Sequence, residues 1–215
     1  MKTVVFDLDG TLLDSAPDII DNLTVALRSV GIFHTTPIPS SLVGPPIQEM
    51  IDNMGIEISE NQKVELISEF RKNYDSSAMP LTTPFHGAQN LLLELKRLGW
   101  NIFFATNKPY LPTSRLIKQF FHGFVDGYCC IDSVSNKKLS KLEMLRFLEL
   151  EYAINPQNAI MVGDGIHDIR AGSEMGWKTI AVNWGYGKEE DLCKEKPTWW
   201  ANEIQDIFDH LIKIR

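Results

Sequence analysis

Apolar residues follow two alternating patterns in the second half of the chain. Short continuous apolar runs, typical of strands buried on both faces, are separated by segments with apolar residues at helical spacing. The pattern predicts strands over 101–106, 127–132, 159–164 and 178–185, and helices over 87–99, 111–121, 140–152, 167–176 and 199–214. Strands that alternate with helices in this way predict an α/β fold, with a parallel sheet covered by helices on both faces.

Two kinds of local signal support these helices. Gly99 and Gly176 follow the last apolar residues of two helical patterns, where glycine commonly ends a helix. Ser140 with Glu143 has the spacing of a capping box, which favours a helix that begins at residue 141.

The segment between residues 14 and 84 does not alternate. It contains helical patterns over 17–31, 41–55 and 59–74, with no convincing strand between them. The Pro- and Thr-containing stretch 79–87 is a plausible hinge back to the alternating pattern. We therefore expect an α/β core formed by 1–13 and 85–215, with an all-helical insert over 14–84 after the first strand.

Composition narrows the class of protein. The chain of 215 residues is 44% hydrophobic, which is ample for a core, and no apolar run reaches the roughly 18 residues of a membrane span. A net charge of −7 disfavours nucleic acid as a partner. The histidines are scattered, and the cysteines lack the spacing of metal ligands. We expect a cytoplasmic protein with reduced cysteines, no zinc site and no membrane partner; the cysteines are Cys129, Cys130 and Cys193.

Acidic residues follow two of the predicted strands. Asp7 and Asp9 come directly after the apolar run Val4-Val5-Phe6, and Asp164 ends another strand with Asp168 four residues later. The carboxyl ends of parallel strands meet at one edge of the sheet, so these acids are expected to converge. Buried carboxylates need an opposing charge, and oxygen ligands suit Mg²⁺. The sequence therefore predicts a magnesium site that attracts an anionic substrate.

Polar residues that could bind phosphate are expected at the same edge. Thr106 and Asn107 end a third strand, and a positive charge could come from Lys141, with Lys137, Lys138 and Lys108 as competitors. Acids, a cation, a hydroxyl and an amide are the groups that phosphoryl transfer requires.

Four stretches together resemble a known family. "DLDGTLLDS" (7–15), "ATNKP" (105–109), the lysine-bearing "SNKKLSKLE" (135–143) and "VGDGIHD" (162–168) resemble, in order, the motifs of the haloacid dehalogenase-like hydrolases. The opening of the chain is similar to the phosphoglycolate phosphatase branch. The resemblance implies a Rossmann-like core and a helical cap inserted after the first motif.

The resemblance also implies roles for the acids. Asp7 would be the nucleophile that forms an aspartyl-phosphate, and Asp9 the general acid and base. Mg²⁺ would be held by Asp7, the backbone carbonyl of Asp9 and Asp164, with Asp168 supporting its water ligands.

The phosphate-binding residues implied by the family are Gly10, Thr106, Asn107 and a lysine. The phosphoglycolate phosphatase branch usually has a Lys-Pro pair at the third motif, which this chain lacks. Lys141, followed by a helical pattern, fits the wider family best, with Lys137 and Lys138 as alternatives.

The predicted function is Mg²⁺-dependent hydrolysis of a small-metabolite phosphomonoester, similar to that of phosphoglycolate phosphatase. A pyrophosphatase or 5′-nucleotidase of the same superfamily is the alternative. A sugar-phosphate mutase is disfavoured because the mutases that resemble this opening tend to carry a histidine near position 19, and this chain has none there. A receiver-like signalling module is disfavoured because such modules are much shorter and lack a helical insert. Asp9 disfavours a dehalogenase.

Neighbouring residues receive more ordinary interpretations. Lys108 is interpreted as a loop lysine or a phosphate-facing surface lysine rather than a catalytic one, His167 as solvent-facing, and Phe70 with Tyr74 as packing residues of a helix. Residues 43–46, "VGPP", either read the substrate or simply break a helix.

Overall fold

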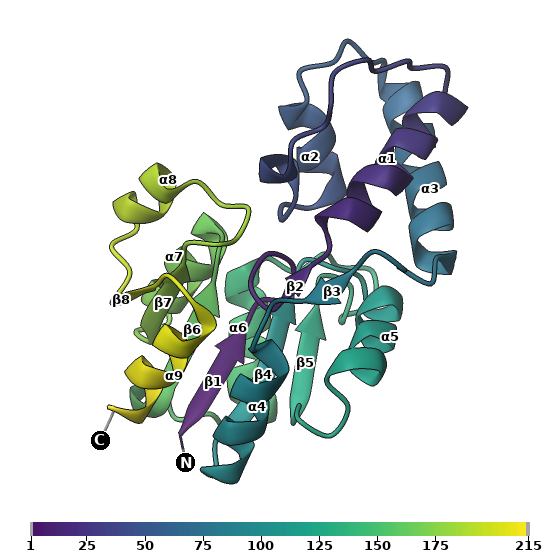
Figure 1. Cartoon of the computed structure of the whole chain (residues 1–215). Coiled ribbons are helices and arrows are strands. Elements are labelled where there is room, and N and C mark those ends of the chain that lie inside the picture. The colour runs from purple at the N-terminus through teal and green to yellow at the C-terminus, as the bar shows by residue number, and fades with distance from the viewer. Residues whose placement is uncertain (1, 214–215) are drawn as a thin grey trace.

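A six-stranded parallel sheet forms the centre of the computed structural model, which describes residues 2–213 (Figure 1). Its strand order is β5-β4-β1-β6-β7-β8, and β1 pairs with β4 on one side and β6 on the other. The strands are β1 (Thr3–Phe6), β4 (Asn101–Thr106), β5 (Gly127–Cys130), β6 (Ala159–Gly163), β7 (Lys178–Val182) and β8 (Trp199–Ala201). The predicted α/β class with a parallel sheet is confirmed.

Helices cover both faces of this sheet. Alternate residues of β1 face opposite sides, so Val4 and Phe6 pack with one set of helices and Val5 with the other. One face is covered by α4 (Ala88–Arg97), α5 (Tyr110–Phe120) and α9 (Ile204–Ile212). The opposite face is covered by α6 (Lys141–Glu151), α7 (Ile166–Glu174) and α8 (Glu189–Lys194). The continuous apolar runs of the sequence therefore reflect strands buried on two sides.

The segment after β1 forms a group of helices beyond the carboxyl ends of the strands (Figure 1). It contains α1 (Ala16–Ser29), the short 3₁₀ helix η1 (Ser40–Leu42), α2 (Ile47–Asn53) and α3 (Glu60–Ser76). Leu23 and Leu27 of α1 and Leu66 of α3 are fully buried and belong to one apolar cluster. We refer to these helices and their connections as the insert.

The insert is joined to the core by a two-stranded antiparallel ribbon that the sequence did not predict. Leu13 pairs with Pro84 and Asp14 with Thr83, which defines β2 (Leu13–Asp14) and β3 (Thr83–Pro84). Asp18 supports this connection, because its carboxylate accepts hydrogen bonds from Thr82 Oγ1 at 2.7 Å and from the backbone N–H of Leu81 at 3.0 Å. The two chain crossings between core and insert therefore lie side by side.

Two predicted helices differ from the structure. The helix expected over 199–214 begins only at Ile204, because Trp199–Ala201 pairs with β7 as the edge strand β8; residue 214 lies outside the described residues. The helix expected over 41–55 is divided into η1 and α2 by residues 43–46, where Pro45 and Pro46 disfavour helical backbone in the residues before them.

The short helix α8 was not predicted from the sequence. None of the helices in the described part of the chain is long and apolar enough to cross a membrane.

Candidate active site

Three buried carboxylates converge at the carboxyl end of the sheet. Asp7 follows β1, Asp164 follows β6, and Asp168 lies in the first turn of α7. Each offers an oxygen, and the three oxygens lie within 4.8 Å of one another. All three residues are at most 7% exposed. The structure thus brings together the acids that the sequence placed at one edge of the sheet.

Lys141 is the lysine that reaches these acids. Its Nζ donates a hydrogen bond to Asp7 Oδ1 at 2.9 Å and lies 2.8 Å from Asp168 Oδ1. It also donates to the backbone carbonyl of Ala105 at 2.8 Å. The capping box of Ser140 and Glu143 fixes the start of α6, and so places Lys141 at the helix end nearest the acids.

The two competing lysines of the same stretch lie elsewhere. The Lys137 side chain is 53% exposed and pairs with Glu143 Oε1 at 2.7 Å. Lys138 is also exposed. Neither forms an ion pair with the buried carboxylates.

Negative charge is crowded at this site. Burial, reinforced by the charges of Asp168 and Asp164, raises the pKa of Asp7 well above its usual value, although Lys141 opposes the shift. Burial and the charge of Asp168 raise the pKa of Asp164 to about 6, while the backbone N–H of Tyr186 and the hydroxyl of Thr11 oppose the shift. A set of buried carboxylate oxygens with excess negative charge is the donor set that Mg²⁺ prefers, so the residues present fit this ion.

The loop after β1 packs tightly against Asp164. Gly10 has φ +83°, and a Cβ at this position would lie 2.3 Å from Asp164 Oδ2. Thr11 Oγ1 donates to Asp164 Oδ1 at 2.9 Å, and the Tyr186 N–H donates to Asp164 Oδ2 at 2.8 Å. The absence of a side chain at Gly10 therefore allows the first loop to approach Asp164.

Thr106 is the last residue of β4, and Asn107 follows it. Thr106 is buried, and its Oγ1 accepts a hydrogen bond from the backbone N–H of Lys108 at 3.2 Å. Asn107 Nδ2 donates to the backbone carbonyl of Gly44 in the insert at 3.0 Å. In this arrangement the Asn107 amide links the core to the insert.

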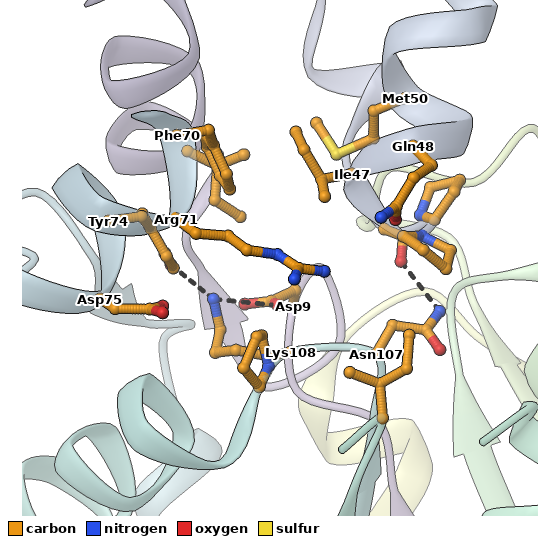
Figure 2. A pocket seen from close by; sticks show the side chains of 16 residues that line it. Asp9, Ile47, Gln48, Met50, Phe70, Arg71, Tyr74, Asp75, Asn107 and Lys108 are labelled. Atoms are coloured by element: carbon orange, nitrogen blue, oxygen red, sulfur yellow. Dashed lines mark hydrogen bonds and ion pairs between the residues drawn. The ribbon is translucent and has the colours of Figure 1, made fainter. Parts of the chain in front are cut away.

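Asp9 has a separate set of partners. Ser15 Oγ donates to Asp9 Oδ1 at 2.5 Å, and Lys108 Nζ lies 3.2 Å from Asp9 Oδ2. Lys108 also donates to the hydroxyl of Tyr74 from α3, and its Nζ lies 4.6 Å from the centre of the Tyr74 ring (Figure 2). Asp9 is thus held directly by Ser15, at the start of the insert, and by Lys108 of the core, which is itself bonded to Tyr74 of the insert.

These contacts correct two interpretations of the sequence. Lys108 is 4% exposed and is not a surface lysine. Tyr74 does stack on Phe70, as expected for a packing residue, but its hydroxyl also reaches the core. The position of Lys108 directly after Thr106 and Asn107 was a usable signal, whereas no pattern along α3 distinguishes Tyr74 from an ordinary packing residue.

Two spaces lie between insert and core. One, of about 390 Å³, is lined by Asp7, Asp164 and Lys141 together with residues 41–45 of the insert. The other, of about 70 Å³, lies on the Asp9 side and is drawn in Figure 2. We call the second space the interface cavity; its lining includes Asp9, Lys108, Ile47, Phe70, Arg71 and Tyr74.

Residues 43–46 and His167 lie at these spaces. Gly44 and Pro45 line both of them, so this segment faces the site as well as separating η1 from α2. The His167 side chain is 42% exposed, as expected, and its Nε2 lies 3.9 Å from Glu49 Oε1 of the insert.

The sequence matches one family along most of its length. Residues 4–182 match the family described as haloacid dehalogenase-like hydrolases. The chain is 32% identical to the tyrosine-protein kinase PtkA of Mycobacterium tuberculosis, an alignment that covers 92% of this chain and 67% of that protein. It is 28% identical to a phosphoglycolate phosphatase of Psychrobacter arcticus, with 99% of this chain and 96% of that one covered.

Solved structures show the same arrangement. A predicted phosphatase from Clostridium acetobutylicum superposes with a TM-score of 0.88 at 24% identity, covering 99% of each chain. PtkA of Mycobacterium tuberculosis superposes with a TM-score of 0.80 at 27% identity, covering 98% of this chain and 97% of that one. The fold is therefore shared with both kinds of protein.

Proposed function

Because the chain belongs to the haloacid dehalogenase-like hydrolases and is a phosphatase of that family, we propose that it hydrolyses a small-metabolite phosphomonoester through an aspartyl-phosphate on Asp7. The observation that carries this proposal is the convergence of Asp7, Asp164, Asp168 and Lys141 in one buried cluster, with Asp9 adjacent. The similarity to phosphoglycolate phosphatases extends over nearly the whole chain and favours a substrate of that kind.

The reaction proceeds in two steps. A carboxylate oxygen of Asp7 bonds to phosphorus, the bond between phosphorus and the leaving oxygen breaks, and Asp9 gives a proton to that oxygen. Asp9 then removes a proton from a water molecule, which attacks phosphorus and releases inorganic phosphate and the Asp7 carboxylate. The separate partners of Asp7 and Asp9 suit these separate roles.

Mg²⁺ is the metal that this site fits. Asp7, the backbone carbonyl of Asp9 and Asp164 would hold it, with Asp168 supporting its water ligands. When bound, the ion neutralises negative charge on the phosphoryl group and on the surrounding carboxylates.

The polar residues at the strand ends bind and orient the phosphoryl group. Lys141 neutralises its charge while keeping Asp7 in place, and Thr106 and Asn107 donate hydrogen bonds to its oxygens. Gly10 shapes the turn after Asp9, and its own N–H donates to the Leu13 carbonyl at 2.8 Å, so its contribution is the path of the loop beside the phosphoryl group.

Lys108 acts as a positioning residue for Asp9. The ion pair at 3.2 Å and the short contact from Ser15 fix both carboxylate oxygens of Asp9 toward the insert side of the site. Because Lys108 is itself held by Tyr74, the position of Asp9 depends on the insert.

The insert acts as a cap. Residues 14–84 cover the carboxyl edge of the core formed by 1–13 and 85–215, and so exclude water and contact the leaving group. We place the protein in the cytoplasm, which agrees with its three free cysteines.

Alternative reactions use the same groups. A pyrophosphatase or a 5′-nucleotidase would differ only in the leaving group, and the similarity to PtkA favours a test for phosphoryl transfer to tyrosine. A receiver-like module would keep the phosphate on Asp7 rather than release it.

Phosphate release distinguishes these functions. The purified protein with Mg²⁺ is incubated with phosphoglycolate, sugar phosphates, nucleoside monophosphates and pyrophosphate, and separately with ATP and a tyrosine peptide. We expect phosphate release from a small phosphomonoester, lost in D7N. Stable phosphorylation of Asp7 or transfer to the peptide, without phosphate release from any ester, would contradict the proposal.

A further inference from the structure

The interface cavity lies where a leaving group must lie. It begins at Asp9 and Lys108 of the core and extends beneath α2 and α3 of the insert (Figure 2). If Asp9 protonates the leaving oxygen, as proposed above, the rest of the leaving group extends from Asp9 into this cavity. The inference below therefore rests on the proposed function.

One positively charged side chain in the lining of the cavity forms no ion pair with an acid of the protein. Of the two cations in the lining, Lys108 is paired with Asp9 and bonded to Tyr74. The side chain of Arg71 forms no ion pair or hydrogen bond with any residue in the described range 2–213, and Figure 2 shows its guanidinium extending from α3 over the cavity toward Asp9.

Besides Asp9, which is paired with Lys108, the acid that shares this lining with Arg71 is Asp75. It lies one turn further along α3, and attraction to Arg71 opposes the effect of burial on the Asp75 pKa. Its carboxylate is nevertheless beyond ion-pair distance of the guanidinium, as no such pair is formed. In a chain with net charge −7, a guanidinium extended over a cavity without a carboxylate in contact indicates a site for an incoming anion.

The remaining walls limit the size and nature of the leaving group. Ile19, Ile47, Met50 and Phe70 supply apolar surface, which suits one or two methylene groups. The cavity is small, at about 70 Å³, which favours a compact leaving group.

We propose that Arg71 binds an anionic group on the leaving group, and that the preferred substrates are small phosphate esters or anhydrides whose leaving group carries its own negative charge. A carboxylate one carbon from the leaving oxygen and a second phosphoryl group both satisfy this description. The guanidinium plane binds either anion through two parallel N–H donors.

The test compares substrates that differ in this charge. The ratio of kcat/KM for phosphoglycolate to kcat/KM for ethyl phosphate is measured in the wild type, R71M and R71K, with pyrophosphate as a third substrate. The control is K72M, which removes the same charge from the adjacent exposed position on α3, outside the cavity lining. Circular dichroism and thermal unfolding check that each variant is folded.

We expect the wild type to prefer the anionic leaving groups and R71M to lower that preference by about 10- to 100-fold, the effect of losing a charge-assisted hydrogen bond. R71K retains part of the preference, and K72M retains all of it. The substrate whose kcat/KM falls more in R71M, phosphoglycolate or pyrophosphate, identifies which leaving group, glycolate or phosphate, the site binds better.

Two results would overturn the inference while leaving the phosphatase intact. One is a wild type that hydrolyses ethyl phosphate as efficiently as both anionic substrates. The other is an R71M variant in which kcat/KM falls by the same factor for all substrates. Phosphate release from none of a wider panel of esters would instead contradict the proposed function, and the inference with it.

Discussion

The two sides of the candidate active site are built differently. The side of Asp7, Asp164 and Asp168 is formed by strand ends and helix starts of the core alone, and its side chains contact one another directly. The side of Asp9 is completed by the insert, through Lys108 and the Tyr74 hydroxyl. On the proposed mechanism, the core side carries the attack on phosphorus, and the insert side carries the contacts to the leaving group.

The largest effect is expected from the core side. D7N removes the proposed nucleophile, so we expect kcat to fall by about 10⁴-fold or more. The measurement is steady-state phosphate release, with circular dichroism as a check on folding. A D7N protein that keeps a tenth of the wild-type rate would remove Asp7 from the nucleophilic role.

The metal gives a second test of the core side. Mg²⁺ at about one hundred times its dissociation constant should raise the free energy of unfolding of the wild type by about 2.7 kcal/mol. In D164N, which lacks one proposed ligand, this shift should disappear and kcat should fall by about 10³-fold. Thermal unfolding with EDTA and with Mg²⁺ measures the shift.

A control separates metal binding from nonspecific effects of the salt. D52N removes an exposed acid of the insert that pairs with Lys63 and does not line the space at the buried acids, and it should keep the full Mg²⁺ shift. An equal shift in D164N and the wild type would place the ion elsewhere.

The insert side should give a smaller effect. K108M leaves Asp9 without its ion pair, and we expect kcat to fall by about 10²-fold, the lower range for loss of general acid catalysis. Y74F removes only the hydroxyl that holds Lys108 and should lower kcat by about 3-fold. Stopped-flow and steady-state kinetics measure both values.

The double variant sharpens this comparison. If Tyr74 acts through Lys108, Y74F should have no further effect on kcat in the K108M background. K118M, which changes an exposed lysine of α5, serves as the control. Additive effects of Y74F and K108M would show that the two residues act independently.

The last comparison measures stability in place of activity and concerns packing within the core side. G10A places a Cβ against Asp164 at a positive φ and should lower the free energy of unfolding by about 2–3 kcal/mol. G31A is a matched control, because Gly31 has φ +78° with no atom within 4 Å of its added Cβ. It should cost about 1 kcal/mol, the backbone contribution alone. The free energy of unfolding is measured by urea denaturation. Equal losses in G10A and G31A would mean that crowding at Asp164 contributes nothing.

The sequence predicted the core side well for physical reasons. Strands buried on two faces require continuous apolar runs, and their carboxyl ends must meet at one edge, so Asp7 and Asp164 could be placed together. The capping box identified the start of α6, and that start carries Lys141 into the cluster. Local signals were sufficient there because each residue is positioned by its own strand or helix.

The insert side of the site and the boundaries of some helices were predicted less well. Tyr74 has the helical spacing of a packing residue, and only the docking of α3 on the core gives its hydroxyl a partner. Trp199 and Trp200 continue a helical pattern, but pairing with β7 at the sheet edge determines their conformation. Both cases depend on contacts between distant segments, which periodicity along the chain does not record.

The β2–β3 ribbon has a consequence for how the chain tolerates change. Leu13 pairs with Pro84, so the outgoing and returning strands are neighbours although about seventy residues separate them. A segment whose ends adjoin in this way can be lengthened, shortened or exchanged without altering the register of the six-stranded sheet. The same catalytic scaffold could in this way accept a different lid, and with it a different range of esters, by transplanting a single continuous stretch of sequence.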